Sequence, residues 1–220
     1  MTLNFLLSAL LGYFIGSIPS AFLLVRWKSR IDIRNVGSGN VGALNSYLVT
    51  RSRMVGAAVF LFDLLKGMAA VSVPGILLNG GGVEAAIAGS ASVIGHNFSV
   101  WLSFKGGRGL ATAAGVALIL AWPLVPAWCL LWFAGYLLTR NVNVSNALAT
   151  LLVIIIALFV PSWALERIVA GTIAADGIRL FVVLTFGVIL LKHIVPVREF
   201  FRKWREPGRV ERPEPEKENS

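Results

Sequence analysis

Long uncharged hydrophobic runs alternate with short polar joints along most of the chain. The first run, Leu3 to Val25, carries no charge and exceeds the roughly 20 residues that a helix needs to cross a bilayer. Because no basic segment precedes it, we expect a retained membrane span rather than a cleavable signal peptide. Met54 to Leu78 and Ala85 to Phe104 are further runs of this kind. The pattern therefore predicts an all-α integral membrane protein.

The run from Leu110 to Thr139 is too long for one crossing, since a single helix over it would reach about 45 Å. Trp122-Pro123-Leu124-Val125-Pro126 lies at its middle, where proline should break a helix. We expect a hairpin of two short helices there. Ala147 to Leu165 and a last segment that ends at Leu191 would complete a compact bundle of about seven transmembrane helices.

The charges are few and lie mainly between the hydrophobic runs. Of 220 residues, 56% are hydrophobic and 14% are charged, with a net charge of +9. In the seven-helix arrangement, all of the 20 Lys and Arg except Lys66, Arg167 and Arg179 fall on one side of the membrane or in the tail. Cytoplasmic joints carry such an excess, so we expect the N-terminus outside and the C-terminus in the cytoplasm. This distribution argues against a nucleic acid partner.

We expect one membrane-embedded domain over residues 1–204 and a disordered charged tail over 205–220, because that end is rich in Pro, Glu and Arg. The single Cys129 lies in an apolar run and excludes an intrachain disulfide. We expect it to be a small packing residue.

Two glycine-rich stretches interrupt the membrane pattern, Val36-Gly37-Ser38-Gly39-Asn40 and Lys105-Gly106-Gly107-Arg108-Gly109. Backbone N–H groups of glycine-rich loops, together with Lys or Arg, can hold phosphate. A helix that starts near Val41, and another after Gly109, would each add favourable partial charge for an anion. The stretches predict two phosphate-bearing ligands at the bilayer surface. The alternatives are a plain turn for the first and a charged membrane anchor for the second.

Other polar residues are open to more than one interpretation. Asp63 and Lys66 are three positions apart and can satisfy each other as an ion pair, which favours a structural role that orients the site. His96 could be a buried, hydrogen-bonded helix residue or part of the chemistry. A third polar joint follows the run that ends at Thr139, with the polar residues Arg140, Asn141, Asn143, Ser145 and Asn146. This joint could form a third wall of the phosphate-binding pocket, or it could be an ordinary loop.

Several motifs occur together in one order over about residues 12 to 146. They are Gly16-Ser17-Ile18-Pro19-Ser20, Asp32-Ile33-Arg34, the Ser38-Gly39-Asn40 loop with Gly42 and Asn45, Asp63-Leu64-Leu65-Lys66-Gly67, Gly95-His96-Asn97-Phe98-Ser99-Val100, and Phe104-Lys105-Gly106-Gly107-Arg108-Gly109-Leu110-Ala111-Thr112. With them the chain resembles the bacterial acyl-phosphate-dependent glycerol-3-phosphate acyltransferases (PlsY).

The resemblance implies a seven-helix protein of the bacterial cytoplasmic (inner) membrane with its active site facing the cytoplasm. It implies transfer of a fatty acyl group from acyl phosphate to glycerol 3-phosphate, which gives lysophosphatidic acid and phosphate in the first step of phospholipid synthesis. No cofactor is implied, and the sequence shows no metal-binding cluster of His, Cys and carboxylates. The catalytic candidates are Ser38, His96 and Lys105. The phosphate-binding candidates are Ser38, Gly39, Asn40, Gly42, Asn45, Lys105, Gly106, Gly107, Arg108, Gly109, Thr112, Arg140, Ser145 and His193.

The chain departs from the family pattern at Leu44, Leu48, Arg108 and Pro196. Thr is usual at the first of these positions, Arg near the second and Lys at the third, and Asn usually follows the C-terminal His by three residues. The alternative to an enzyme is therefore a diverged relative that binds or transports lipids or organophosphates.

Overall fold

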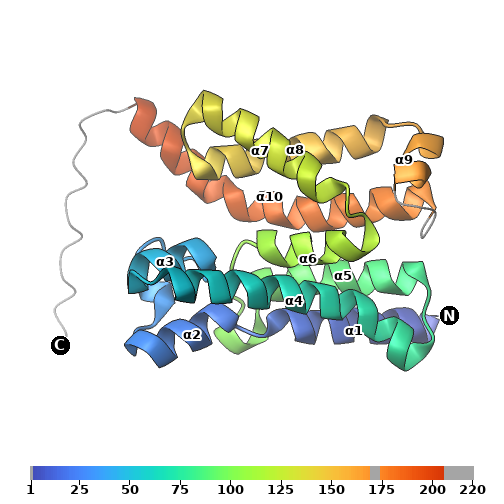
Figure 1. Cartoon of the computed structure of the whole chain (residues 1–220), viewed down its shortest axis with the longest axis horizontal. Coiled ribbons are helices and arrows are strands. Elements are labelled where there is room, and N and C mark those ends of the chain that lie inside the picture. The colour runs from blue at the N-terminus through green and yellow to red at the C-terminus, as the bar shows by residue number, and fades with distance from the viewer. Residues whose placement is uncertain (1, 169–173, 206–220) are drawn as a thin grey trace.

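The protein is a bundle of α-helices in the computed structural model, which describes residues 2–168 and 174–205 (Figure 1). Most of the helices run along the long axis of the molecule, and short helices lie at its ends. In chain order the elements are α1 (Thr2–Ser17), α2 (Ser20–Ser29), the 3-10 turn η1 (Ile33–Asn35), α3 (Ala43–Thr50), α4 (Arg53–Leu78), α5 (Gly82–Asn97), the 3-10 turn η2 (Val100–Leu102), α6 (Leu110–Leu120), α7 (Leu124–Thr139), α8 (Val142–Phe159), α9 (Ser162–Ile168) and α10 (Ala175–Arg205).

Helices long and apolar enough to cross a membrane occur in four places within the described ranges, by length and composition. The pair α6 and α7 is shorter but equally apolar, and the break between these two helices confirms the expected hairpin. Pro123 stands at the start of α7, where its missing N–H costs no helix bond. The four candidate spans are Thr2–Ser29, Arg53–Leu78, Val142–Phe159 and Ala175–Arg202.

Several segments differ from the expectation. Helix α5 ends at Asn97 and does not continue to Phe104, and the run Ala147 to Leu165 is divided between α8 and α9. The uncharged run Leu3 to Val25 is not one helix, because the chain breaks at Ile18-Pro19 between α1 and α2; Pro19 has no N–H to continue the ladder. The last segment does not end at Leu191, since α10 continues to Arg205. That helix therefore takes in the first residue of the expected tail, and residues 206–220 lie outside the described residues.

Arg179 is one of the three cations that the seven-helix arrangement left off the cytoplasmic side, and it lies within α10. Its side chain donates hydrogen bonds to the carbonyl oxygens of Ala157, at 3.3 Å, and Val160, at 2.9 Å. A cation at these positions satisfies carbonyl groups at the C-terminal end of α8.

Small residues let the helices approach closely in one half of the bundle. A Cβ atom on Gly16 of α1 would lie 1.9 Å from the carbonyl oxygen of Ser92 in α5. Likewise, a Cβ atom on Gly115 of α6 would lie 2.0 Å from the carbonyl oxygen of Leu64 in α4. Such close contacts are typical of helix pairs in membranes. They hold α1, α4, α5 and α6 together, while α7, α8 and α10 form the other half (Figure 1).

The two halves meet around a buried cluster that includes Val93, Val116, Val153 and Ile189. The N-terminal end of α1 and the C-terminal end of α10 lie at opposite ends of the bundle (Figure 1). The short helices α2 and α3 lie at the end to which α10 points. The functional candidates gather near this end.

Candidate active site

A cavity of about 530 Å³ combines a polar part with a larger apolar part. The polar part draws its residues from the first glycine-rich loop, α3, α4, α5, the second loop and α8. These polar lining residues are Ser38, Asn40, Asn45, Asp63, His96, Arg108, Asn143 and Asn146.

Asn45 organises the first loop. Its side-chain amide donates to the carbonyl oxygens of Val36, at 3.1 Å, Asn40, at 3.0 Å, and Ile33, at 3.4 Å. Its Oδ1 accepts from the Ser38 amide at 3.0 Å. The donor group of this buried side chain is therefore used within the loop, and its oxygen accepts one hydrogen bond there. Asn45 therefore fixes the shape of the first loop, and it also lines the cavity.

The rest of the first loop is also tied down. The amides of Gly39 and Gly42 donate to the carbonyl oxygens of Val36 and Asn40, at 3.2 and 3.1 Å. Gly39 has a φ of +66°, which a side chain would strain. The exposed Ser38 accepts a 3.4 Å hydrogen bond from the Asn40 amide at its hydroxyl.

Two glycine amides of the second loop donate to carbonyl oxygens at the end of α5. The amide of Gly106 donates to the Asn97 carbonyl at 3.2 Å, and that of Gly107 donates to the His96 carbonyl at 3.0 Å. A Cβ atom on Gly107 would lie only 2.2 Å from the Nε2 of His96. These glycines are needed because the loop packs directly on the end of α5.

Two helix starts present backbone amides to the cavity. In α6 the first helical bond runs from Ala113 to Gly109, so the amides of Leu110 and Ala111 precede the ladder. Both residues line the cavity. In α3 the first helical bond runs from Ser46 to Gly42, so the amides of Ala43 and Leu44 precede the ladder. These two residues also line the cavity. The cavity therefore receives the N-terminal ends of two helices, which favour negative charge.

The cations lie at different distances from the cavity. Arg108 lines the cavity and donates a short hydrogen bond to the side chain of Asn143. Burial lowers the pKa of the Arg108 guanidinium, but the group stays charged at neutral pH. Lys105 and Arg140 are exposed and do not line it. Arg34 is held in an ion pair with Asp32 at 2.6 Å, and this pairing lowers the pKa of Asp32.

The third wall comes from α8, through Asn143 and Asn146. His193 does not line the cavity, but its Nε2 lies 3.3 Å from the Nδ2 of Asn146 and its Nδ1 lies 2.8 Å from the Ile189 carbonyl. Ser145 instead donates to the Asn141 carbonyl at 2.7 Å. The polar joint was visible in the sequence, but its spacing could not show which side chains face the cavity.

Thr112 is fully buried in the first turn of α6, and its hydroxyl has no hydrogen-bond partner within the described residues. Like Gly39, Gly106 and Gly107, it is outside the cavity lining. These four candidate residues therefore do not line the cavity.

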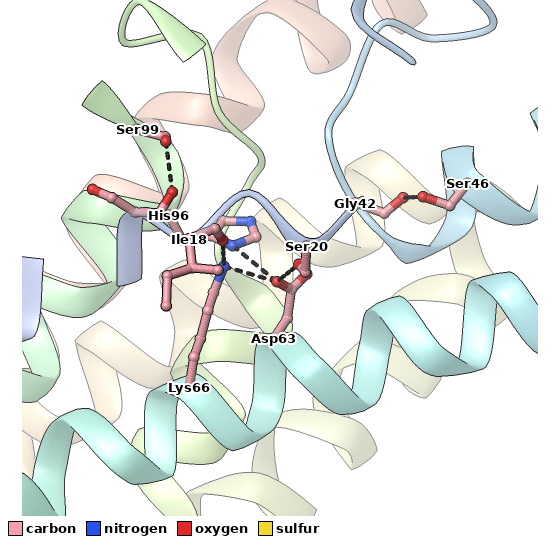
Figure 2. Close-up of polar contacts among 9 residues, drawn as sticks. Ile18, Ser20, Gly42, Ser46, Asp63, Lys66, His96 and Ser99 are labelled. Carbon is pink, nitrogen blue, oxygen red and sulfur yellow. Dashed lines mark hydrogen bonds and ion pairs between the residues drawn. The ribbon is translucent and has the colours of Figure 1, made fainter. Parts of the chain in front are cut away.

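His96 and Asp63 stand together in the polar part. His96 is in the last turn of α5, and its Nδ1 lies 3.5 Å from the Asp63 Oδ1 (Figure 2). That same oxygen also lies 2.8 Å from the Lys66 Nζ. The expected pair of Asp63 and Lys66 is present, and it includes the histidine as well.

The apolar part is built from α3, α4, α6, α7 and α10. Cys129 is exposed and lines it, so the expectation of a packing residue was wrong. The apolar lining includes Leu48, Phe60, Leu64, Leu118, Leu124, Val125, Trp128 and Phe186.

A cavity with an anion-binding end and a long apolar wall suits a ligand that has an anionic head and a hydrocarbon chain. The fold and this site define a helical membrane protein that handles amphipathic, phosphate-bearing molecules.

Comparison with known proteins gives the family. A family model described as "Glycerol-3-phosphate acyltransferase" matches residues 6–203. Among curated relatives, the glycerol-3-phosphate acyltransferase of Sinorhizobium fredii is 46% identical over 146 residues, which cover 66% of this chain and 70% of the relative. That of Agrobacterium fabrum is 44% identical over 155 residues, which cover 70% and 73%.

A solved structure agrees with this assignment. The crystal structure of PlsY, an integral membrane glycerol 3-phosphate acyltransferase, in its glycerol 3-phosphate form, superposes with a TM-score of 0.73 at 28% identity. The match covers 90% of this chain and 92% of that one. The chain belongs to the glycerol-3-phosphate acyltransferase family, which confirms the resemblance carried by its motifs.

Proposed function

We propose that this protein transfers a fatty acyl group from acyl phosphate to the hydroxyl of glycerol 3-phosphate. The products are lysophosphatidic acid and inorganic phosphate. The observation that carries the proposal is the cavity, which joins two helix starts and Arg108 to a long apolar wall. Relatives named for this acyltransferase activity and a solved relative in its lysophosphatidic acid form support it.

For the membrane arrangement we propose seven crossings, with the N-terminus outside and the site facing the cytoplasm of a bacterial inner membrane. The positions of the basic joints support this orientation. An odd number of crossings also agrees with the opposite placement of the start of α1 and the end of α10 (Figure 1).

The phosphates are bound, in this proposal, at the polar part of the cavity. Arg108 and the first amides of α3 and α6 supply positive charge there, and Asn143 orients the guanidinium. Lys105 is exposed, but its flexible four-carbon stem allows it to reach a phosphate when substrate binds. Asn45 and Gly107 act indirectly, because they fix the two loops.

The reaction needs no covalent enzyme intermediate, since acyl phosphate is already activated. The glycerol hydroxyl attacks the acyl carbon, a new ester bond forms, and the bond to the phosphate oxygen breaks. The enzyme contributes positioning and charge neutralisation. The hydroxyl proton passes to His96, which lines the cavity, or to a phosphate of the substrates.

The test is the choice of donor. Purified protein in detergent is given glycerol 3-phosphate with either palmitoyl phosphate or palmitoyl-CoA, and lysophosphatidic acid is measured by mass spectrometry. We expect lysophosphatidic acid with palmitoyl phosphate as the donor and none with palmitoyl-CoA. Product from palmitoyl-CoA alone would refute the proposed donor, while binding of both ligands without product would favour a diverged binding protein.

A further inference from the structure

Helix α10 is longer than one membrane crossing requires. Its 31 residues give a length of about 46 Å, whereas the hydrocarbon core of a bilayer is about 30 Å thick. Its C-terminal end extends beyond α7 and α8 (Figure 1). Residues 192–205 contain five Lys or Arg and one Glu, and such side chains are costly within hydrocarbon. The C-terminal part of α10 therefore lies at the level of the lipid head groups.

A hollow of about 410 Å³ adjoins this part of α10. Within the described part of the chain it is lined by Val197, Arg198, Phe201, Arg202 and Arg205. At about 100° per residue, these five positions fall in one stripe along the helix. Val197 and Phe201 lie at one edge of the stripe, and the arginines occupy the rest. The hollow is therefore apolar on one side and basic on the other.

The apolar edge of the stripe is open to the surroundings of the protein. Phe201 is 48% exposed, and Trp204, three positions further on, is 72% exposed. Aromatic rings beside Lys or Arg are typical of helices at the boundary between membrane and water. A water-soluble anion would cover the arginines and leave these rings in water, whereas a lipid covers both.

The basic edge of the stripe suits a phosphate group. Guanidinium groups bind phosphate through pairs of N–H donors, and Arg198 and Arg205 are exposed. The charged residues among the described lining of the hollow are all arginines. The neighbouring acid, Glu199, is outside that lining and instead interacts electrostatically with Arg108 of the active-site cavity. The hollow therefore favours a ligand with negative charge.

We propose that this hollow binds an anionic phospholipid of the surrounding bilayer. Arg198 and Arg205 hold the phosphate of the head group, and the first carbons of the lipid chains lie on Val197 and Phe201. The hollow shares no described lining residue with the active-site cavity. The lipid is therefore bound in addition to the substrates of the proposed function, and its binding does not depend on acyl transfer.

The first test counts bound lipids by native mass spectrometry of the detergent-purified protein. Phosphatidylglycerol and phosphatidylcholine with the same acyl chains are titrated in parallel, so that only the head group differs. We expect phosphatidylglycerol to bind on the order of 10-fold more tightly, because each basic residue near an anionic lipid contributes to binding. Equal affinity for the two lipids would overturn the inference.

The second test locates the site. Arg198→Gln combined with Arg205→Gln removes two charges from exposed positions and keeps side chains that favour a helix. We expect this variant to bind the two lipids about equally. The matched control is Arg51→Gln combined with Arg53→Gln, since both residues are exposed at the joint of α3 and α4. The control should keep the preference for phosphatidylglycerol; the same loss in both variants would contradict a site on α10.

Two further arms identify the occupant. Inorganic phosphate in excess should leave phosphatidylglycerol bound, because the apolar edge favours a lipid; displacement would assign the hollow to a free anion. A chain that ends at Arg205 lacks the five Glu of residues 206–220 and should keep the same lipid preference. A preference that appears only after this truncation would mean that the C-terminal segment, and not a lipid, occupies the hollow. None of these arms measures turnover, so a failure of the proposed acyl transfer leaves them decisive.

Discussion

Asn45 offers the sharpest test of how the first glycine-rich loop is built. Its amide group faces three carbonyl oxygens, those of Ile33, Val36 and Asn40, and its oxygen accepts from the Ser38 amide. Asn45→Asp keeps the size of the side chain and its acceptor, but it replaces the donor with an oxygen. A carboxylate oxygen of Asp would then face the three carbonyl oxygens to which the amide nitrogen of Asn45 donates.

The magnitude follows from these contacts. Three of the four hydrogen bonds are 3.0 or 3.1 Å long, and each contributes about 1 kcal/mol. The substitution removes the three hydrogen bonds that the amide group donates, one of them at 3.4 Å, which costs up to about 3 kcal/mol in the stability of the loop. Since about 1.4 kcal/mol corresponds to a factor of ten, kcat/KM should fall on the order of 100-fold.

The assay is initial-rate release of phosphate with both substrates, paired with thermal unfolding. Because the four contacts lie within residues 33–45, we expect the unfolding temperature to change little. Asn79→Asp is the control, since the exposed Asn79 ends α4 at the other end of the bundle and receives the same charge. A rate for Asn45→Asp within threefold of the wild type would refute this account of the loop.

Three further predictions test other parts of the site. Gly107→Ala should abolish activity because its methyl group would overlap His96, whereas Gly135→Ala should be tolerated, since its nearest neighbour would be 3.5 Å away; rates and expression levels measure both. Alkylation of Cys129, the single cysteine, should be slowed by palmitoyl phosphate and not by glycerol 3-phosphate; equal labelling in both cases counts against an acyl chain in the apolar part. Arg108→Met should raise KM for at least one substrate by on the order of 10-fold to 100-fold, because a hydrogen bond to a charged group contributes about 1.5–3 kcal/mol; unchanged KM values for both would contradict its role.

Elements set by local chemistry were predictable from the sequence. Pro123 within an uncharged run predicted the hairpin of α6 and α7, and Gly109 predicted the start of α6. The spacing of Asp63 and Lys66 predicted their ion pair. Each of these features depends on residues that are neighbours along the chain.

Features that depend on distant segments were not predictable in the same way. A glycine that allows a loop to bind phosphate and a glycine that allows a loop to pack on a helix look alike in a sequence. The close packing of Gly107 on His96 is visible only in the fold. Asp63 was interpreted as half of a local pair because Ser20 and His96 approach it only after folding. The choice of Asn146 over Ser145 as a cavity residue depends on how α8 is rotated.

The most direct test of the central claim is phosphate release by the purified, detergent-solubilised protein with palmitoyl phosphate, with and without glycerol 3-phosphate. The account predicts release only when both are present, one lysophosphatidic acid formed per phosphate, and loss of turnover in Lys105→Ala. A folded protein that binds either ligand but releases no phosphate would contradict an acyltransferase. Full activity in Lys105→Ala would contradict the role proposed for that residue.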